Sequence, residues 1–197
     1  MRWFILCLTF ALGISRAEAA AGKQGPLVGQ LLVASPDIGD PHFARTVILI
    51  VDQDASGALG IIINGPAQEH PIASVLEAIG VPDKKASGTI RLYLGGPVDP
   101  ALGFILHSPD YHLPGTKMLT KDIALTTSAE IIQDMARSKG PKKTLVAFGY
   151  AGWGPGQLDA EIARRDWANT LADAKLVFET DRADLWRIAW SRRMMGL

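Results

Sequence analysis

The sequence is nearly without cysteine, and its charges of opposite sign balance. The only cysteine, Cys7, lies in an apolar run at the start of the chain. If that run is removed, a disulfide framework, a thiolate zinc site and a cysteine nucleophile are all excluded. The 20 basic and 20 acidic residues give a formal net charge of zero. This balance argues against the broad basic surface of a nucleic-acid-binding protein, so we find no strong nucleic-acid signal.

The short motifs that identify common enzyme classes are also missing. The sequence contains no H-E-x-x-H zinc pair and no G-x-S-x-G nucleophile elbow. We therefore expect no cofactor and no metal site. The chain shows no internal repeat and no low-complexity segment. Its 197 residues, 48% of them hydrophobic, are enough for one domain with its own core.

The first 19 residues have the three parts of a secretory signal peptide. Arg2 supplies the charge, residues 3–14 form a mostly apolar run, and Ala17-Glu18-Ala19 is a small-residue cleavage site. The run is too short to span a bilayer, which needs about 20 residues. We expect a signal peptide at 1–19, a linker at 20–28 and one domain at 29–197. This predicts a periplasmic or secreted protein with no membrane span after cleavage. The alternative is a cytoplasmic protein that keeps its N-terminus.

The most distinctive stretch of the chain is 148–161. Glycines at 149, 152, 154 and 156 surround Tyr150 and Trp153. An apolar run leads into it and a helix-favouring polar run leads out, so the pattern predicts a strand, a glycine-rich turn and a helix. The spacing fits neither the Walker motif nor the dinucleotide motif. Two interpretations stay open: an anion site at the helix start, or a corner in which Tyr150 and Trp153 fill the core.

Elsewhere, periodicity predicts short strands in groups. Apolar runs between turn residues predict strands at 31–34, 46–51, 58–63, 90–94, 104–106, 123–125, 144–148 and 176–178. Helical spacing and end signals predict helices at 70–79, 127–139, 155–165 and 181–193, the second with a capping box from Thr127 to Glu130. The second and third strands form a hairpin. Strands that do not alternate with helices favour an α+β domain with a mixed or mostly antiparallel sheet.

Many blocks of the sequence resemble those of the AlgH/YqgE family of bacterial proteins. The blocks are Gly29–Ala34, Asp40-Pro41 with Phe43, Gly57–Asn64, Gly95–Val98, Gly103–His107, Asp122–Thr126 and Gly149–Leu158, followed by Glu161, Trp167 and Phe178. The resemblance covers residues 29–190. It implies an α+β fold whose strongly bent sheet forms a partial barrel flanked by helices. Family members have been labelled transcriptional regulators, a role that applies here only if the N-terminus is not an export signal.

The resemblance also shows one departure. The family usually has a basic residue after the asparagine, whereas Gly65 follows Asn64 here. If a basic side chain at this place binds an anion in the family, this chain has lost it.

These observations favour a non-catalytic binding or regulatory protein. Turns rich in glycine, asparagine and tryptophan follow three apolar strands, and we expect them to meet in one recess. The predicted ligand-binding residues are Asn64, Gly95, Gly96, Gly152, Trp153, Gly154, Gly156 and Gln157. Bare amides there suit a carboxylate, a phosphate or a peptide backbone. We therefore expect another protein or a small anionic ligand as the partner.

Two other functions remain as alternatives. A hydrolase-like enzyme would use His107 or His42, and it requires an acid and a nucleophile beside the histidine. A structural partner protein would instead expose an apolar patch, for which the Trp186 and Trp190 helix is the best place.

Overall fold

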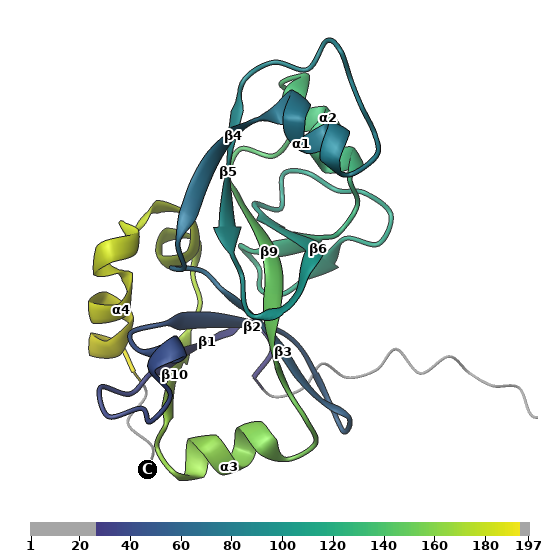
Figure 1. Ribbon diagram of the computed structural model, residues 1–197. Coiled ribbons are helices and arrows are strands. Elements are labelled where there is room, and N and C mark those ends of the chain that lie inside the picture. Colours follow the sequence, from purple (N-terminus) through teal and green to yellow (C-terminus); the bar gives the residue numbers. More distant parts are fainter. Residues whose placement is uncertain (1–26, 194–197) are drawn as a thin grey trace, which may run out of the picture.

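A curled sheet forms the centre of the computed structural model, which describes residues 27–193 (Figure 1). Its strands are β1 (Gln30–Ala34), β2 (Val47–Asp54), β3 (Gly57–Ile62), β4 (Ala67–Pro71), β5 (Thr89–Leu94), β6 (Val98–His107), β7 (Lys117–Met118), β8 (Ala124–Thr126), β9 (Thr144–Trp153) and β10 (Trp167–Leu171). The main path of the sheet runs β10-β1-β2-β3-β9-β6-β8-β7, and β5 joins β4 to β9. Among these described strands every pair is antiparallel except β5 with β9.

Helices lie outside the sheet (Figure 1). They are α1 (Ile72–Ala78), α2 (Glu130–Ala136), α3 (Gln157–Ala163) and α4 (Arg182–Ser191), with a 3-10 turn η1 (Pro41–Phe43) and a π-helical turn η2 (Lys175–Glu179). Helices α1 and α2 contact each other at one end of the molecule, while α4 packs on β1 and β2. The predicted α+β domain, with a bent, mostly antiparallel sheet that forms a partial barrel flanked by helices, is confirmed.

Strand β9 connects the two halves of the sheet, because it pairs with β3, β5 and β6. We predicted that the strand ends at Phe148 and that a glycine-rich turn follows. That boundary was wrong, since β9 continues to Trp153 and the turn is confined to 154–156. Gly149 has a φ of 75°, a left-handed conformation that glycine adopts without steric cost. The first glycines of the stretch therefore let the strand bend and approach its neighbours.

Other predictions failed where the local pattern was short or polar. The apolar run 176–178 is not a strand but part of η2, in which Leu176 and Val177 are buried. Strands β4 and β10 were not predicted, because their sequences mix polar residues with apolar ones and lack the runs that identify buried strands.

The predicted capping box at the start of α2 was also wrong. The N-cap position is Ala129, which has no side-chain cap. The Ser128 hydroxyl instead accepts a hydrogen bond from the Glu130 amide at 3.2 Å.

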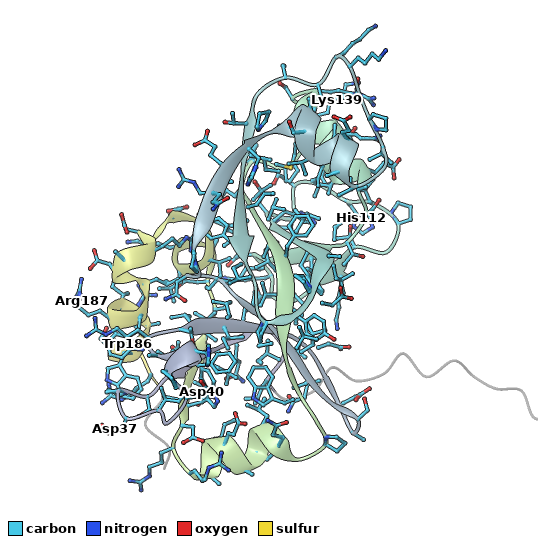
Figure 2. All side chains as sticks on the ribbon, viewed as in Figure 1. Asp37, Asp40, His112, Lys139, Trp186 and Arg187 are labelled. Carbon is cyan, nitrogen blue, oxygen red and sulfur yellow. The ribbon has the colours of Figure 1, made fainter. Side chains whose placement is uncertain are left out.

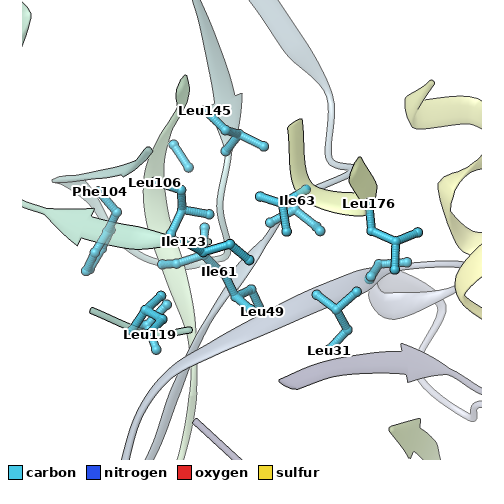
Figure 3. Packing of buried hydrophobic residues seen from close by; sticks show 14 of the residues in the cluster. Leu31, Leu49, Ile61, Ile63, Phe104, Leu106, Leu119, Ile123, Leu145 and Leu176 are labelled. Atoms are coloured by element: carbon cyan, nitrogen blue, oxygen red, sulfur yellow. The ribbon is translucent and has the colours of Figure 1, made fainter. Parts of the chain in front are cut away.

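The core lies between the curled sheet and the elements packed on it. Figure 3 shows Leu49 and Ile61 of the β2–β3 hairpin between Leu106 of β6 and Leu31 of β1. A second cluster, on the other face of β1 to β3, packs against α3 and includes Trp153, Leu158 and Trp167. Strands β1 and β2 are thus buried on both faces, which explains why they are continuous apolar runs.

The predicted signal peptide at 1–19 lies outside the described residues, as does the predicted linker up to residue 26. Among the residues 27–193 that are described, no helix combines the length and the hydropathy needed to cross a membrane.

Candidate functional site

A recess of about 400 Å3 lies between η1, the end of β9, α3 and the start of β10. This volume is typical of ligand pockets, which measure about 300–1,000 Å3. Three aromatic side chains line it, Phe43, Trp153 and Trp167, together with the carboxylates of Asp40, Glu161 and Asp166. We call this the aromatic recess. Figure 2 shows Asp40 on the loop that follows β1.

The three rings hold one another in place. Trp153 and Trp167 meet edge to face with centroids 6.1 Å apart, and Phe43 meets Trp167 in the same way at 5.7 Å. Trp153 is 7% exposed and Trp167 is 4% exposed. The aromatic walls are therefore rigid and mostly shielded from water.

Glu161 joins these rings to α3. Its Oε2 accepts hydrogen bonds from the indole Nε1 of Trp153 at 2.8 Å and of Trp167 at 2.9 Å. Its Oε1 accepts one from Nε2 of Gln157 at 2.9 Å. Gln157 and Glu161 are neighbours on one helical face because they are four residues apart. Glu161 forms no ion pair within residues 27–193, so three neutral donors surround its charge.

The remaining charges make the recess acidic. Arg164 pairs with Asp166 at 2.7 Å, so these two charges offset each other. Asp40 stays ionised, because hydrogen bonds from the backbone N–H and the ring of His42 hold its pKa below the ordinary value. Asp40 and Glu161 therefore leave a net negative charge beside aromatic rings. Such a site attracts an organic cation.

A second recess, of about 370 Å3, lies between the β2–β3 hairpin and the end of β9. Gly152 and Trp153 line both recesses, and Asp52 and Asp54 line the second one. Asp52 is paired with Lys117 at 2.8 Å. The Ser56 hydroxyl donates a hydrogen bond to Asp54 and holds the pKa of that carboxyl below its ordinary value. This recess is acidic as well.

The structure divides the predicted ligand-binding residues into two groups. Gly152, Trp153 and Gln157 line the aromatic recess. Gly154 lies in the turn next to it, where its N–H donates to Oε1 of Gln157 at 3.1 Å. Gly156, with a φ of 70°, is the N-cap of α3.

Asn64, Gly95 and Gly96 belong to the other group, and they line neither of these two recesses. Oδ1 of Asn64 accepts from the Val47 N–H at 2.8 Å, and its Nδ2 donates to the carbonyl oxygen of Arg45 at 2.9 Å. Asn64 thus holds the loop before β2.

Gly95 and Gly96 make the close crossing of two backbones. Gly95 donates its N–H to the Phe148 carbonyl at 2.8 Å, and a Cβ added at Gly96 would overlap the carbonyl group of Tyr150. Both glycines therefore pack against β9 through bare backbone.

Sequence reasoning did not assign Phe43, Asp40, Trp167 or Glu161 to this site, although all four occur in the blocks that carry the family resemblance. The spacing of Gln157 and Glu161 on one helix was a usable signal. No pattern indicated that Trp167 lies beside Trp153, because β10 itself was not predicted.

The histidines of the hydrolase alternative have different surroundings. His107 is fully buried, with Nδ1 2.9 Å from the carbonyl oxygen of Ser108 and Nε2 2.9 Å from Oγ1 of Thr126. Burial holds the pKa of His107 below its ordinary value. The Ser108 hydroxyl donates to Asp110 instead of to His107. This arrangement leaves the ring no path to a substrate in solution.

His42 is exposed, and its Nδ1 lies 2.9 Å from the Asp40 carboxylate. No serine, threonine or cysteine bonded to this pair is seen within residues 27–193. Within the same part of the chain, no group of three histidine, cysteine, aspartate or glutamate side chains is placed to hold a metal ion.

Trp186 and Trp190, the place named for an apolar patch, are stacked on α4 with centroids 5.9 Å apart. Both are partly buried against the main core, and Nε1 of Trp186 donates to the Ala34 carbonyl at 2.8 Å. The guanidinium of Arg45 lies over Trp186, and that of Arg193 lies over Trp190. These contacts anchor α4 to β1.

Comparison with known proteins gives consistent matches over nearly all of the described chain. A family model described as AlgH-like matches residues 31–196. A UPF0301 protein of Cereibacter sphaeroides (strain ATCC 17029 / ATH 2.4.9) is 42% identical, with 81% of this chain and 88% of that protein covered. A UPF0301 protein of Methylococcus capsulatus is 45% identical, with 82% and 88% covered.

Solved structures match as well. The solution structure of the AlgH protein from Pseudomonas aeruginosa has a TM-score of 0.71 and 32% identity, and 87% of this chain and 92% of that chain are covered. Protein DIP2367 of Corynebacterium diphtheriae has a TM-score of 0.65 at 22% identity, with 90% and 92% covered, and it shows the fold alone.

Proposed function

We propose a non-catalytic binding role for the aromatic recess of this chain. The chain belongs to the AlgH-like family, as its sequence blocks predicted. The observation that carries this proposal is Glu161. Its carboxylate is partly buried, accepts hydrogen bonds from two indoles and an amide, and forms no ion pair in the described part of the chain, since the nearby Arg164 pairs with Asp166. These three hydrogen bonds fix the carboxylate at the edge of the recess, where a bound cation would form a direct ion pair with it.

The proposed ligand is an organic cation, such as the ammonium or guanidinium group of a small amine or of a basic side chain. Aromatic rings and a carboxylate are the usual surroundings of these groups, and a cation over a ring gains about 0.5–2 kcal/mol. This differs from the anionic ligand expected from the glycine-rich turn. The change rests on Asp40 and Glu161, whose charges would repel an anion in the same recess.

Binding is a better account of the geometry than hydrolysis. The recess holds rings and carboxylates fixed by hydrogen bonds, whereas His107 lies in the core and His42 lies on the surface beside Asp40 alone. A regulatory role would follow if the bound cation belongs to a partner protein.

The experiment is an NMR titration that follows the indole Nε1–H signals of Trp153 and Trp167. Choline and arginine amide serve as cationic probes, and acetate and phosphate serve as anionic probes. We expect both indole signals to shift with the cations. In Glu161→Gln, which keeps an acceptor for the indoles but loses the charge, the affinity for choline should fall at least tenfold, or about 1.4 kcal/mol.

Asp159→Asn is the matched control, because Asp159 is an exposed carboxylate on the same helix. It should bind choline like the native protein. Equal affinity in Glu161→Gln would overturn the cationic ligand, and shifts with acetate or phosphate alone would restore the anionic one. If neither indole responds to any of the four probes, the recess is not the binding site.

A further inference from the structure

We propose that a third recess, lined by Gly65, Glu69, Arg91, Tyr93 and Arg182, binds an oxyanion, either a carboxylate or a phosphate. Its volume is about 410 Å3, and none of its lining residues belongs to the aromatic recess. We call it the arginine recess. It is a binding site of opposite charge preference, independent of the one proposed above.

The β4–β5 ribbon and the start of α4 create this recess. Strands β4 and β5 are antiparallel, with Glu69 opposite Arg91 and Ala67 opposite Tyr93. Alternate residues of a strand share one face, so Arg91 and Tyr93 point to the same side of the ribbon. Arg182, the first residue of α4, places its guanidinium 5.5 Å from the ring centroid of Tyr93. Two arginines from distant parts of the chain thus flank one tyrosine.

Arg182 lacks the acceptors that a buried guanidinium needs. Its Nη2 donates to the carbonyl oxygen of Val177 at 2.7 Å, but its Nη1 is buried and has no hydrogen-bond partner. Buried polar atoms in native proteins are nearly always paired, and each exception requires an explanation. Arg182 also forms no ion pair within residues 27–193. A ligand oxygen beside the guanidinium would supply the missing acceptor after a small rotation of the side chain.

Arg91 is exposed, and within the described part of the chain its side chain has neither a hydrogen bond nor an ion pair. This is notable because Glu69 lies directly opposite on β4. The Glu69 carboxylate accepts a hydrogen bond from the Thr89 hydroxyl instead. The recess therefore contains two guanidinium groups and one carboxylate, a net positive charge.

Guanidinium groups favour oxyanions for geometric reasons. The planar fork of an arginine donates two parallel hydrogen bonds to a carboxylate or a phosphate, which a point charge cannot do. The Tyr93 hydroxyl forms no hydrogen bond within residues 27–193, so it can donate a further one to an oxyanion in the recess. Gly65 keeps one wall free of a side chain, since an added Cβ there would overlap the Leu94 carbonyl.

The test measures the affinity of the full chain for inorganic phosphate and for acetate, by calorimetry and by the NMR signals of the Tyr93 ring. We expect both anions to shift the Tyr93 signals, and the binding to weaken with added salt. Arg91→Gln should lower the affinity for phosphate at least tenfold. Arg187→Gln is the matched control, because Arg187 points outward from α4 (Figure 2). It should leave the affinity unchanged.

Arg182→Gln should also abolish binding, but it removes the bond to Val177 and lowers stability as well. The outcome is therefore decided by Arg91→Gln, because within residues 27–193 the Arg91 side chain has no hydrogen bond or ion pair to lose. Native-like phosphate and acetate affinities in that variant, or no response of Tyr93 to either anion, would overturn the proposal. A response to phosphate alone identifies a phosphate ester as the ligand class, and a response to both includes carboxylates. Glu161→Gln should bind phosphate normally, so this test is independent of the aromatic recess.

Discussion

At the scale of single residues, Glu161 has two separable roles. It is the acceptor for two indole N–H groups, and with Asp40 it makes the aromatic recess acidic. The first role concerns stability, because Trp153 and Trp167 are buried and need a hydrogen-bond acceptor. The second underlies the proposed binding of a cation. Substitutions that keep the acceptor but remove the charge can distinguish them.

Glu161→Ala should lower the free energy of unfolding by about 2–6 kcal/mol, because each of the two indoles left without an acceptor costs about 1–3 kcal/mol. Glu161→Gln should cost less than about 1 kcal/mol, since its carbonyl oxygen still accepts from both indoles. Urea unfolding followed by far-UV circular dichroism measures both values. Equal losses in the two variants would mean that the charge, and not the acceptor, stabilises the fold.

At the scale of elements, β9 is the strand that connects the two halves of the sheet. Its glycines allow β5 and the start of β6 to come close where their paths cross. Gly96, in the link between β5 and β6, and Gly149 of β9 are tight points of that crossing, since a Cβ on Gly96 would overlap the Tyr150 oxygen and a Cβ on Gly149 would overlap the Gly96 oxygen. The crossing therefore depends on backbone shape instead of side-chain packing.

Gly96→Ala should lower the free energy of unfolding by at least about 2 kcal/mol, because the added methyl group overlaps backbone that cannot move away. Gly154→Ala is the matched control, since its added Cβ would lie 3.9 Å from Oε1 of Gln157, an ordinary contact. We expect it to change stability by less than about 0.5 kcal/mol. Thermal and urea unfolding check both substitutions. Similar stabilities would show that β5 and β9 can separate at this point without cost.

At the scale of the whole molecule, His107 couples stability to pH. The side chain is fully buried, and burial holds its pKa below 6.5, so the folded protein keeps the ring neutral. The unfolded chain binds a proton as the pH falls through 6.5. His107 therefore stabilises the fold fully above that pH, and this contribution decreases as the pH falls below it.

We expect the melting temperature of the native protein to fall between about pH 7.5 and pH 5, and His107→Gln to reduce this dependence. Asp40, Asp54, Asp83 and Asp110, whose pKa values are lowered by hydrogen bonds, act in a separate window below their ordinary value of 3.8. Melting curves at matched ionic strength measure the effect. The same slope in both proteins would assign the pH dependence to other groups.

Much of the architecture was predictable from local pattern. Strands β1 and β2 are uninterrupted apolar runs, because both of their faces are buried, and their positions were predicted within a few residues. The predicted hairpin of β2 and β3 and the terminal helix α4 are confirmed. The family was identifiable because its blocks occur in one order along the chain.

The candidate sites were less predictable. The aromatic recess joins Phe43 to Trp167, and the arginine recess joins Arg91 to Arg182. Residues this far apart in the chain meet only because of the strand order and the bend of the sheet. Asn64 was predicted to bind a ligand, yet its amide holds a loop through two hydrogen bonds.

The sequence by itself determined the family, the α+β class and the apolar strands. Buried elements need apolar residues in runs or at regular spacing, and both patterns are visible in the sequence. Only the tertiary structure decided which corners share a recess and which sign of charge each recess has. The physical reason is that the sequence gives the chemistry of each side chain at its own position, whereas a binding site depends on long-range contacts. Strand order and sheet curvature create those contacts.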